Sequence, residues 1–453
     1  ARMATVKDLA PLIVHGDVPG RFILGRVDGH LVATENRMAG VDGSALQRHR
    51  ARERTGDRGG VAMIGPSRCG KTTAAINGIV RWSGPAVLSS VKWDLAEPTM
   101  VRRRELGEVR IFSPTRDQSA TWSPLRGAES YSVARDAAKQ LCSASSKGGM
   151  NGESDYWYQQ GEIVLSSLLF IAANSGGTIA NVCDWVMTQD RPIDTDDGQV
   201  KPRLEALVTS SDPAVADGAR RSANALSGIW QADDRYRSSV YMTAVNAIWP
   251  WTDPKVEAAA LTTEIDLDWL LSGNNTLYLC APIKDQERFG PVFGGLLGDL
   301  MDQVFDRVDR TGRPLVDPLL FVLDEAGNTP MRQLPQWASL VAGLGVQLVT
   351  IWQSKAQLDA LYGVANADVI LANHLTKLGF AGISDHSTLD YFTRLTGDEQ
   401  VVSRTLSTPV DGDRSLSESA SLLPLLSNHS LRQQRTGQAL LVHGSLPPAA
   451  LRR

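Results

Sequence analysis

A glycine-rich segment near residue 70 has the residue types and the spacing of a phosphate-binding loop. It matches the pattern G-x-x-x-x-G-K-[ST] in full, with the residues Gly65, Pro66, Ser67, Arg68, Cys69, Gly70, Lys71 and Thr72, followed by Thr73. Glycines allow the backbone to wrap around a phosphate chain, and the start of the following helix offers unpaired N–H groups to the anion. Lys71 would reach the β- and γ-phosphates of ATP, and the Thr72 hydroxyl would hold Mg²⁺. The alternative is a glycine-rich turn with a solvated lysine.

Two carboxylates follow an apolar run much later in the chain. Residues 319–323 are typical of a buried strand, and Asp324 and Glu325 come directly after it. Open α/β sheets bind ligands at the carboxyl ends of their parallel strands. Asp324 would hold Mg²⁺, largely through water, and Glu325 would orient and deprotonate the attacking water. An ordinary strand end with a helix-capping aspartate is the alternative, but the phosphate loop favours an ATPase.

A glutamine follows the next apolar run. Residues 346–351 predict another buried strand, and Gln353 comes just after it. In a RecA-like sheet the strand in this position ends beside the γ-phosphate, so Gln353 would sense that group or position the water. The alternative is an amide at the start of a helix. We therefore predict Lys71, Glu325 and Gln353 as catalytic residues.

Strand-like and helix-like segments alternate around these motifs. Short apolar runs occupy residues 61–64, 86–88, 109–112, 276–280, 319–323, 346–351, 375–378 and 439–442. Continuous apolar strands indicate a mainly parallel sheet covered by helices on both faces. Between residues 155 and 260 the apolar residues recur instead at helical spacing, which predicts an all-helical insertion.

This alternation divides the chain into four predicted parts. They are a β-rich lead-in and linker (1–58), the first part of a nucleotide-binding domain (59–154), an all-α insertion domain (155–265) and the second part of the nucleotide-binding domain (266–453). Within the lead-in, Asp28 and Gly29 form a hairpin turn signal. Residues 411–421 are polar and rich in serine, which predicts an exposed loop.

Composition excludes several classes of protein. With 46 basic and 50 acidic residues the formal net charge is −4, which argues against a histone-like nucleic-acid binder but not against a basic groove inside a ring. No window reaches the roughly 18 apolar residues of a membrane span. The four cysteines lie far apart, so neither a disulfide framework nor a structural metal is expected.

Aromatic and basic residues near position 240 are candidate contacts for single-stranded DNA. They are Trp230, Trp249 and Trp251, with Arg235 and Arg237 close by in sequence. Bases stack on aromatic rings, and arginine binds phosphate. Tryptophans at helix ends more often belong to a core, and we favour that interpretation.

The chain resembles the type IV coupling proteins, the DNA-translocating ATPases of conjugation and type IV secretion. The strongest strings are residues 323–328 (LDEAGN), residues 353–358 (QSKAQL) and Tyr362 with Gly363. Further similar positions are residues 22–25, Lys92, Asp94, and residues 123–125, 155–157 and 442–448. Nearly the whole chain is covered, and the order of elements agrees.

This resemblance implies a RecA-like nucleotide-binding domain, interrupted by an all-α domain, that assembles as a homo-hexameric ring around DNA. ATP and Mg²⁺ would be its cofactors. DNA, with single strands as the expected form, would be a partner, together with a relaxase or secreted protein and components of the secretion channel. The chain, soluble as given, would act at the cytoplasmic side of the cell membrane.

Three departures from the family pattern accompany the resemblance. Cys69 occupies a position that is usually serine, and residues 340–345 lack the arginine finger that some members carry there. Members usually have an N-terminal membrane anchor, so we expect either a trimmed form of a longer chain or an anchorless variant. The missing arginine finger and the missing anchor both predict a mainly monomeric protein in dilute solution.

Three functions remain open at this point. The first is a motor that couples ATP hydrolysis to the transfer of DNA or nucleoprotein into a type IV secretion channel. The second is a septal-type DNA translocase, which shares the RecA core. The third is a substrate-recognition platform that binds ATP but turns over little alone, which the missing arginine and the modest net charge favour.

Overall fold

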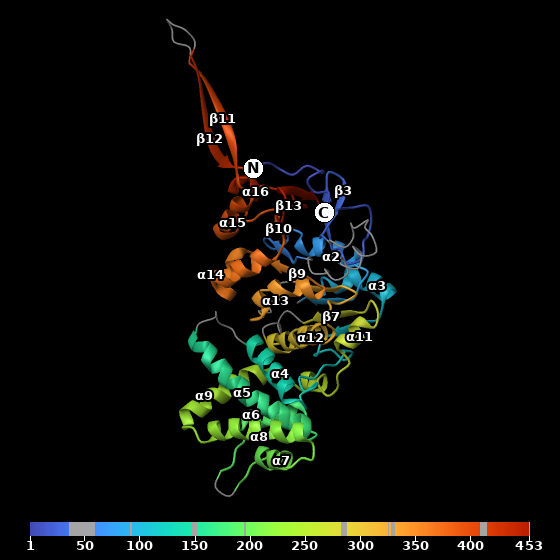
Figure 1. The fold of residues 1–453 in the computed structure, drawn as a ribbon, viewed down its shortest axis with the longest axis vertical. Coiled ribbons are helices and arrows are strands. Elements are labelled where there is room, and N and C mark those ends of the chain that lie inside the picture. The colour runs from blue at the N-terminus through green and yellow to red at the C-terminus, as the bar shows by residue number, and fades with distance from the viewer. Residues whose placement is uncertain are drawn as a thin grey trace.

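The computed structural model describes residues 1–35, 59–90, 93–145, 152–193, 196–281, 288–324, 326–327, 331–407 and 415–452. Figure 1 shows an α/β body, with a helical lobe at one end and a long two-stranded ribbon projecting from the other. The N-terminus lies at the base of the ribbon, and the C-terminus lies beside β3.

Within the described residues, 12 strands form one sheet in the order β1-β3-β2-β14-β13-β10-β4-β9-β8-β5-β7-β6. Their bounds are β1 (Ile13–Val14), β2 (Ile23–Val27), β3 (His30–Ala33), β4 (Val61–Ile64), β5 (Ala86–Ser90), β6 (Val109–Phe112), β7 (Thr276–Cys280), β8 (Leu319–Leu323), β9 (Val346–Trp352), β10 (Thr376–Phe380), β13 (Gln438–His443) and β14 (Ala449–Arg452). The neighbours from β10 to β6 are parallel, whereas those from β1 to β10 are antiparallel.

Helices cover both faces of the parallel strands. The helices of the body are α2 (Lys71–Arg81), α3 (Ala96–Leu106), α11 (Leu267–Leu271), α12 (Gly290–Thr311), α13 (Leu334–Leu340), the 3₁₀ helix η3 (Val341–Leu344), α14 (Lys355–Asn373), α15 (His386–Thr396) and α16 (Asn428–Arg432). Side chains alternate across the sheet, so Val61 and Met63 pack on the side of α2, and Ala62 and Ile64 on the opposite side. This burial on both faces explains the uninterrupted apolar runs.

A contact from the lead-in fixes the helix that follows the phosphate loop. A Cβ atom on Gly78 of α2 would lie 2.2 Å from Phe22 Cζ, so only glycine allows this ring to pack there.

The predicted hairpin between β2 and β3 is confirmed. Asp28 and Gly29 have φ values of 46° and 83°, as the two central residues of a type I′ turn require.

The helical lobe contains α4 (Tyr131–Ala144), α5 (Gly152–Asn174), α6 (Ile179–Met187), α7 (Val200–Val208), α8 (Pro213–Trp230), α9 (Asp234–Ile248), η1 (Trp249–Thr252) and α10 (Pro254–Ala258). Helix α4 precedes the predicted start of the insertion at residue 155, yet it packs against α5 as well as α12. The exact division into domains stays a prediction. The core interpretation of the tryptophans is confirmed for Trp251, which is buried, whereas Trp249 is half exposed. Arg237 is also buried.

The ribbon corrects one expectation. Strands β11 (Asp398–Ser407) and β12 (Ser415–Pro424) pair antiparallel, so the predicted loop over residues 411–421 is wrong from Ser415 onward. Residues 408–414 lie outside the described part of the chain. Serine at alternate positions from Ser415 to Ser421 gives β12 a polar composition, but Ala420 and Leu422 alternate with those serines as a strand requires.

Among the helices of the described residues, none is both long enough and apolar enough to cross a lipid bilayer.

Candidate nucleotide site

The phosphate loop lies between the end of β4 and the start of α2. Gly70, the N-cap of α2, has a φ of 100°, and Arg68 has a φ of 64°, so the chain turns sharply twice before the helix. Position 65 also requires glycine, because a Cβ atom there would lie 2.8 Å from Phe380 Cβ and 2.9 Å from Cys69 Sγ. Cys69 thus packs beneath the loop, while Ser67 and Arg68 are exposed on its outer side.

The Lys71 side chain folds back into this loop. It is only 9% exposed, and its Nζ donates to the carbonyl oxygens of Gly65 at 2.5 Å and of Pro66 at 2.8 Å. The first turn of α2 contains no acidic residue, so nothing there opposes the partial positive charge of the helix N-terminus. The loop, the N-terminus of α2 and the Lys71 ammonium together favour the binding of an anion. Thr72 is partly exposed and Thr73 exposed at the start of the same helix.

Asp324 follows β8 at the same edge of the sheet. It is 7% exposed, and its Oδ2 accepts a hydrogen bond from Ser90 Oγ at 3.3 Å. Ser90 is the last residue of β5, the parallel neighbour of β8. No motif in the sequence signals this serine, because only the strand order brings it to the carboxylate. Glu325 lies outside the described residues, so its role as the base stays a prediction.

Strand β9 connects the phosphate loop to the loop that follows Asp324. It lies between β4 and β8, with Ile64 paired to Trp352 and Leu323 paired to Thr350. The N–H of Gly65 donates to the Trp352 carbonyl at 3.2 Å. The N–H of Ala326 donates to the Ile351 carbonyl, also at 3.2 Å. The two motifs are therefore bonded to consecutive residues of one strand.

Gln353 is the next residue after β9, and its side chain is exposed. It is not the N-cap of α14, because Ser354 occupies that position and its Oγ accepts from the Gln357 N–H at 3.1 Å. This arrangement weakens the alternative of a helix-start amide. The structure therefore brings the phosphate loop, Asp324 and Gln353 to the carboxyl ends of three neighbouring strands.

A buried histidine links β9 to α14. His374 contacts Thr350 Oγ1 through Nε2 at 3.0 Å and the Ile370 carbonyl through Nδ1 at 2.6 Å. Burial lowers the pKa of His374 to about 4, so the ring is neutral at physiological pH. Trp352 Nε1 also donates to Thr350 Oγ1, at 2.9 Å. No motif in the sequence signals this support.

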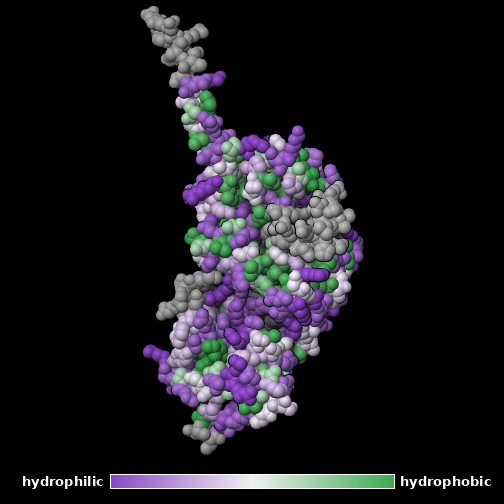
Figure 2. Space-filling model, viewed as in Figure 1, coloured by the Kyte–Doolittle hydropathy of each residue, from purple (hydrophilic) through white to green (hydrophobic). Residues whose placement is uncertain are grey.

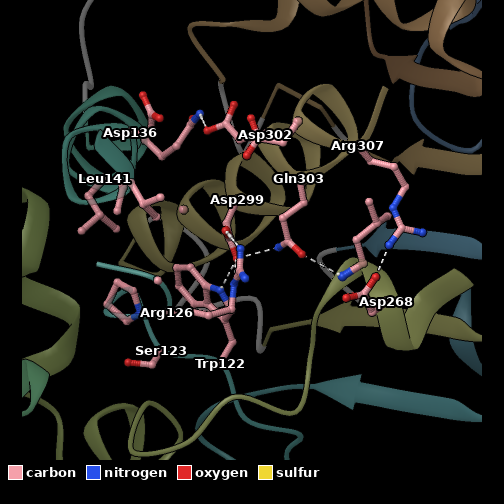
Figure 3. Close-up of a pocket in the computed structure, with 18 of the residues that line it drawn as sticks. Trp122, Ser123, Arg126, Asp136, Leu141, Asp268, Asp299, Asp302, Gln303 and Arg307 are labelled. Atoms are coloured by element: carbon pink, nitrogen blue, oxygen red, sulfur yellow. Dashed lines mark hydrogen bonds and ion pairs between the residues drawn. The ribbon is translucent and has the colours of Figure 1, made fainter. Parts of the chain in front are cut away.

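A separate cavity of about 610 Å³ lies between α4 and α12 (Figure 3). In its wall, Asp299 accepts from Arg126 at 2.7 Å and from Trp122 Nε1 at 2.9 Å. Asp302 accepts from Gln140 Nε2 at 2.8 Å. Burial, reinforced by neighbouring carboxylates, raises the pKa of Asp302 to about 6. Of the described residues that line this cavity, none is a predicted nucleotide-site residue.

A known protein family matches almost the whole chain. Residues 26–453 match the family described as Type IV secretory system Conjugative DNA transfer. The chain belongs to this family. The match includes the phosphate loop, Asp324 and Gln353, and it bears out the resemblance to the coupling proteins.

Two relatives of this chain are described as conjugal transfer proteins. The chain is 23% identical over 406 residues to the probable conjugal transfer protein TraG of Sinorhizobium fredii, covering 86% of this chain and 61% of that protein. It is 22% identical over 407 residues to the conjugal transfer protein TraG of Agrobacterium fabrum, covering 87% of this chain and 59% of that protein. The chain therefore spans less than two thirds of the length of these relatives.

Solved structures of the plasmid coupling protein TrwB share the fold. TrwB in complex with the ATP analogue ADPNP matches with a TM-score of 0.64 at 13% identity, covering 100% of this chain and 92% of that chain. TrwB in complex with ADP and Mg²⁺ matches with a TM-score of 0.62 at 13% identity, covering 96% and 95%. The predicted fold class, a RecA-like α/β domain interrupted by helices, is confirmed.

Proposed function

We propose that this chain is a P-loop ATPase that couples ATP hydrolysis to the transfer of DNA or nucleoprotein into a type IV secretion or conjugation channel. The observation that carries the proposal is the convergence of the phosphate loop, Asp324 and Gln353 at one edge of the sheet. The names of the TraG relatives support the process, and the nucleotide complexes of TrwB support the ligand.

Each predicted residue has a distinct role in this proposal. The backbone N–H groups of the loop would bind the triphosphate, and Lys71 would bring positive charge to the transferring phosphoryl group. Thr72 and Asp324 offer the hard oxygen ligands that Mg²⁺ prefers, and the ion would neutralise charge on the phosphates. Glu325 would accept a proton from the attacking water. Gln353 would orient that water or sense the γ-phosphate.

The partners follow from the same proposal. The working form would be a homo-hexameric ring around DNA, with single strands as the preferred form, at the cytoplasmic side of the membrane. A relaxase or secreted protein and components of the channel would be its other partners. RecA-like motors bind nucleotide at a boundary between subunits, and such head-to-tail contacts close into a ring when the rotation fits. We expect a mainly monomeric protein in dilute solution and specific activity that rises with protein concentration.

The recognition platform remains the second candidate. It is favoured by residues 340–345, which contain no arginine, since a finger arginine contributes about 10³-fold or more to turnover in related enzymes. A septal-type translocase is disfavoured by the family match over residues 26–453.

DNA-stimulated ATP hydrolysis at defined salt separates the motor from the platform. A motor should be stimulated severalfold by single-stranded DNA, with the stimulation falling as salt rises, because contacts to phosphates release counterions. A platform should hydrolyse ATP at one low rate with or without DNA. Lys71→Ala provides the blank for contaminating ATPases. DNA-independent turnover at every salt concentration would reject the motor.

A further inference from the structure

The first half of α14 packs next to the proposed nucleotide site, in contact with Gln353 and Gly327. This segment, residues 355–362, begins two residues after Gln353 and ends where Gly363 leaves the helical conformation, with φ 75° and ψ 155°. Figure 1 shows α14 beside β9 and α13. Two side chains of this segment, Gln357 and Tyr362, contact β9 or the residue that directly follows it. They also contact residues after Asp324, namely Gly327 at the near end of that loop and Met331 at its far end.

Gln357 bridges the end of β9 and the near end of that loop. Its Oε1 accepts from the Gln353 N–H at 3.1 Å. Its amide also lies flush against Gly327, because a Cβ atom added at Gly327 would lie 2.1 Å from Gln357 Nε2 and 2.4 Å from its Cδ. A single side chain thus fixes the backbone of Gln353 and contacts a residue three positions after Asp324.

Tyr362 holds the far end of the same loop. Its hydroxyl accepts from the Met331 N–H at 3.1 Å. Its ring packs edge-on against Trp352, with centroids 6.1 Å apart and an interplanar angle of 83°. Burial raises the pKa of Tyr362 well above its ordinary value, so the hydroxyl stays protonated at any physiological pH. Trp352 is also the residue whose carbonyl accepts from Gly65 of the phosphate loop.

The segment is itself fixed on its other side. The Lys355 ammonium, which is buried, lies 2.7 Å from Asp359 and 3.1 Å from Asp368. Asp368 belongs to the half of α14 beyond Gly363, so this pair of contacts spans the break in the helix. The Lys355 N–H also donates to Thr388 Oγ1 of α15 at 2.7 Å, which anchors the segment from a third element.

We propose that Gln357 and Tyr362 are positioning residues for hydrolysis, which hold Gln353, Gly327 and Met331 in one rigid frame against the phosphate loop. This inference rests on the proposed ATPase function. Neither side chain need touch the nucleotide, because each acts through the backbone of its neighbours. Misplacement of reacting groups by about 1 Å costs on the order of 100-fold in rate, so loss of the frame should lower turnover more than nucleotide affinity.

The competing explanation is that Gln357 only caps the helix. Ser354 and Gln357 do resemble a capping box, in which the N-cap side chain and the third residue satisfy the first N–H groups. Ser354→Ala is therefore the matched control, because it removes a cap of the same helix without touching Gly327 or the Gln353 N–H.

The experiment compares Gln357→Ala, Tyr362→Phe and Ser354→Ala in the full chain. The measurements are kcat and KM for ATP, affinity for a fluorescent ATP analogue, and the melting temperature. We expect kcat to fall about 10- to 100-fold in Gln357→Ala and about 10-fold in Tyr362→Phe, with affinity within about threefold of the parent. Ser354→Ala should lower the melting temperature as much as Gln357→Ala but keep kcat within about threefold. Equal losses of kcat in Ser354→Ala and Gln357→Ala would overturn the proposal.

A second variant pair tests the contact itself. Gly327→Ala should slow turnover because its new Cβ collides with Gln357, and Gln357→Ala should add no further loss in that background, since the collision is gone. Additive losses would mean that the two residues act independently and would overturn the frame.

Hydrogen exchange at the Gln353 amide separates this proposal from the proposed function, because it requires no turnover. Loss of its acceptor in Gln357→Ala should speed this exchange about tenfold or more. Unchanged exchange would overturn the frame even in an active ATPase. If the parent and Lys71→Ala hydrolysed ATP equally, the ATPase proposal would fail instead, and with it the catalytic role of the frame, whatever the exchange rates.

Discussion

Two polar regions of this molecule differ in the charge that they attract. At the carboxyl edge of the sheet, the phosphate loop contains the Lys71 ammonium and leads into a helix whose first turn lacks acidic residues. Between α4 and α12, a cavity of about 610 Å³ has six aspartates, among them Asp299 and Asp302, and three arginines in its described lining (Figure 3). Figure 2 shows hydrophilic side chains gathered over the same part of the surface, around α12. The first region favours a triphosphate, whereas the second opposes one.

A cavity of suitable volume does not by itself locate a ligand. The cavity has a volume suited to a small molecule. However, burial of Asp302 already disfavours its own negative charge, and a phosphate placed there would add to that cost. The sheet edge instead provides the positive end of a helix, with no acidic residue in its first turn, together with a lysine. The type of group that faces the ligand decides between the two.

The largest effect should come from the charge at the sheet edge. Lys71→Ala should lower ATP hydrolysis by about 10²- to 10³-fold, because it removes positive charge from the transferring phosphoryl group. The matched control is Lys139→Ala, which removes an exposed lysine from α4 beside the cavity. That variant should hydrolyse ATP within about twofold of the parent rate. Turnover at the parent rate in Lys71→Ala would remove the site assignment.

The two carboxylates at the sheet edge should differ in their effects. Glu325→Gln should still bind ATP and Mg²⁺ but hydrolyse about 10²-fold more slowly, because it keeps the shape of the side chain and loses the base. Asp324→Ala should instead weaken Mg²⁺-dependent nucleotide binding. Titration of a fluorescent ATP analogue, with and without Mg²⁺, separates binding from turnover. If both variants only raised KM, the two roles would be misassigned.

The smallest effect should come from the cavity. Asp302 has a folded-state pKa of about 6, above the ordinary value of 3.8, so its protonated form is the one that folding favours. Its charge therefore lowers stability above pH 6, and this cost disappears as the pH falls toward 4. Asp302→Asn keeps an oxygen for Gln140 and should raise the free energy of unfolding by about 1 kcal/mol at pH 7.5 and by much less at pH 4.5.

Asp299→Asn gives the contrast within the same cavity. Asp299 is paired with Arg126, so its replacement should lower stability at pH 7.5. Denaturant unfolding at the two pH values tests both variants. A loss of stability in Asp302→Asn at pH 7.5 would mean that its carboxylate is compensated by a partner, and the contrast between the two regions would weaken.

The sequence predicted the sheet edge because its signals are local. Residues 65–72 form one continuous motif, and the apolar runs before Gly65, Asp324 and Gln353 each predicted a buried strand that the structure contains. The order β4-β9-β8 was not predicted and comes from the structure. What the motifs did not reveal is how β9 bonds to the loops on either side of it.

The remaining features depend on contacts between distant residues. Ser90 reaches Asp324 across 234 positions of sequence, and Gln140 reaches Asp302 across 162. No spacing rule connects such pairs. Gln357 lay within a recognised string, but its contact with Gly327 exists only once α14 packs against the loop. The ribbon was missed because the serines of β12 gave a loop-like composition to an alternating strand.

Photo-crosslinking with an azido-ATP probe tests whether the nucleotide binds at the sheet edge, since it reports the position of the nucleotide without requiring turnover. We expect labelled peptides from the sheet edge, around the phosphate loop and Gln353. This labelling should be competed by unlabelled ATP and greatly reduced in Lys71→Ala. Peptides from α4 and α12 should carry no competable label. Competable labelling on the cavity helices, unaffected by Lys71→Ala, would contradict the account and move the nucleotide to the other region.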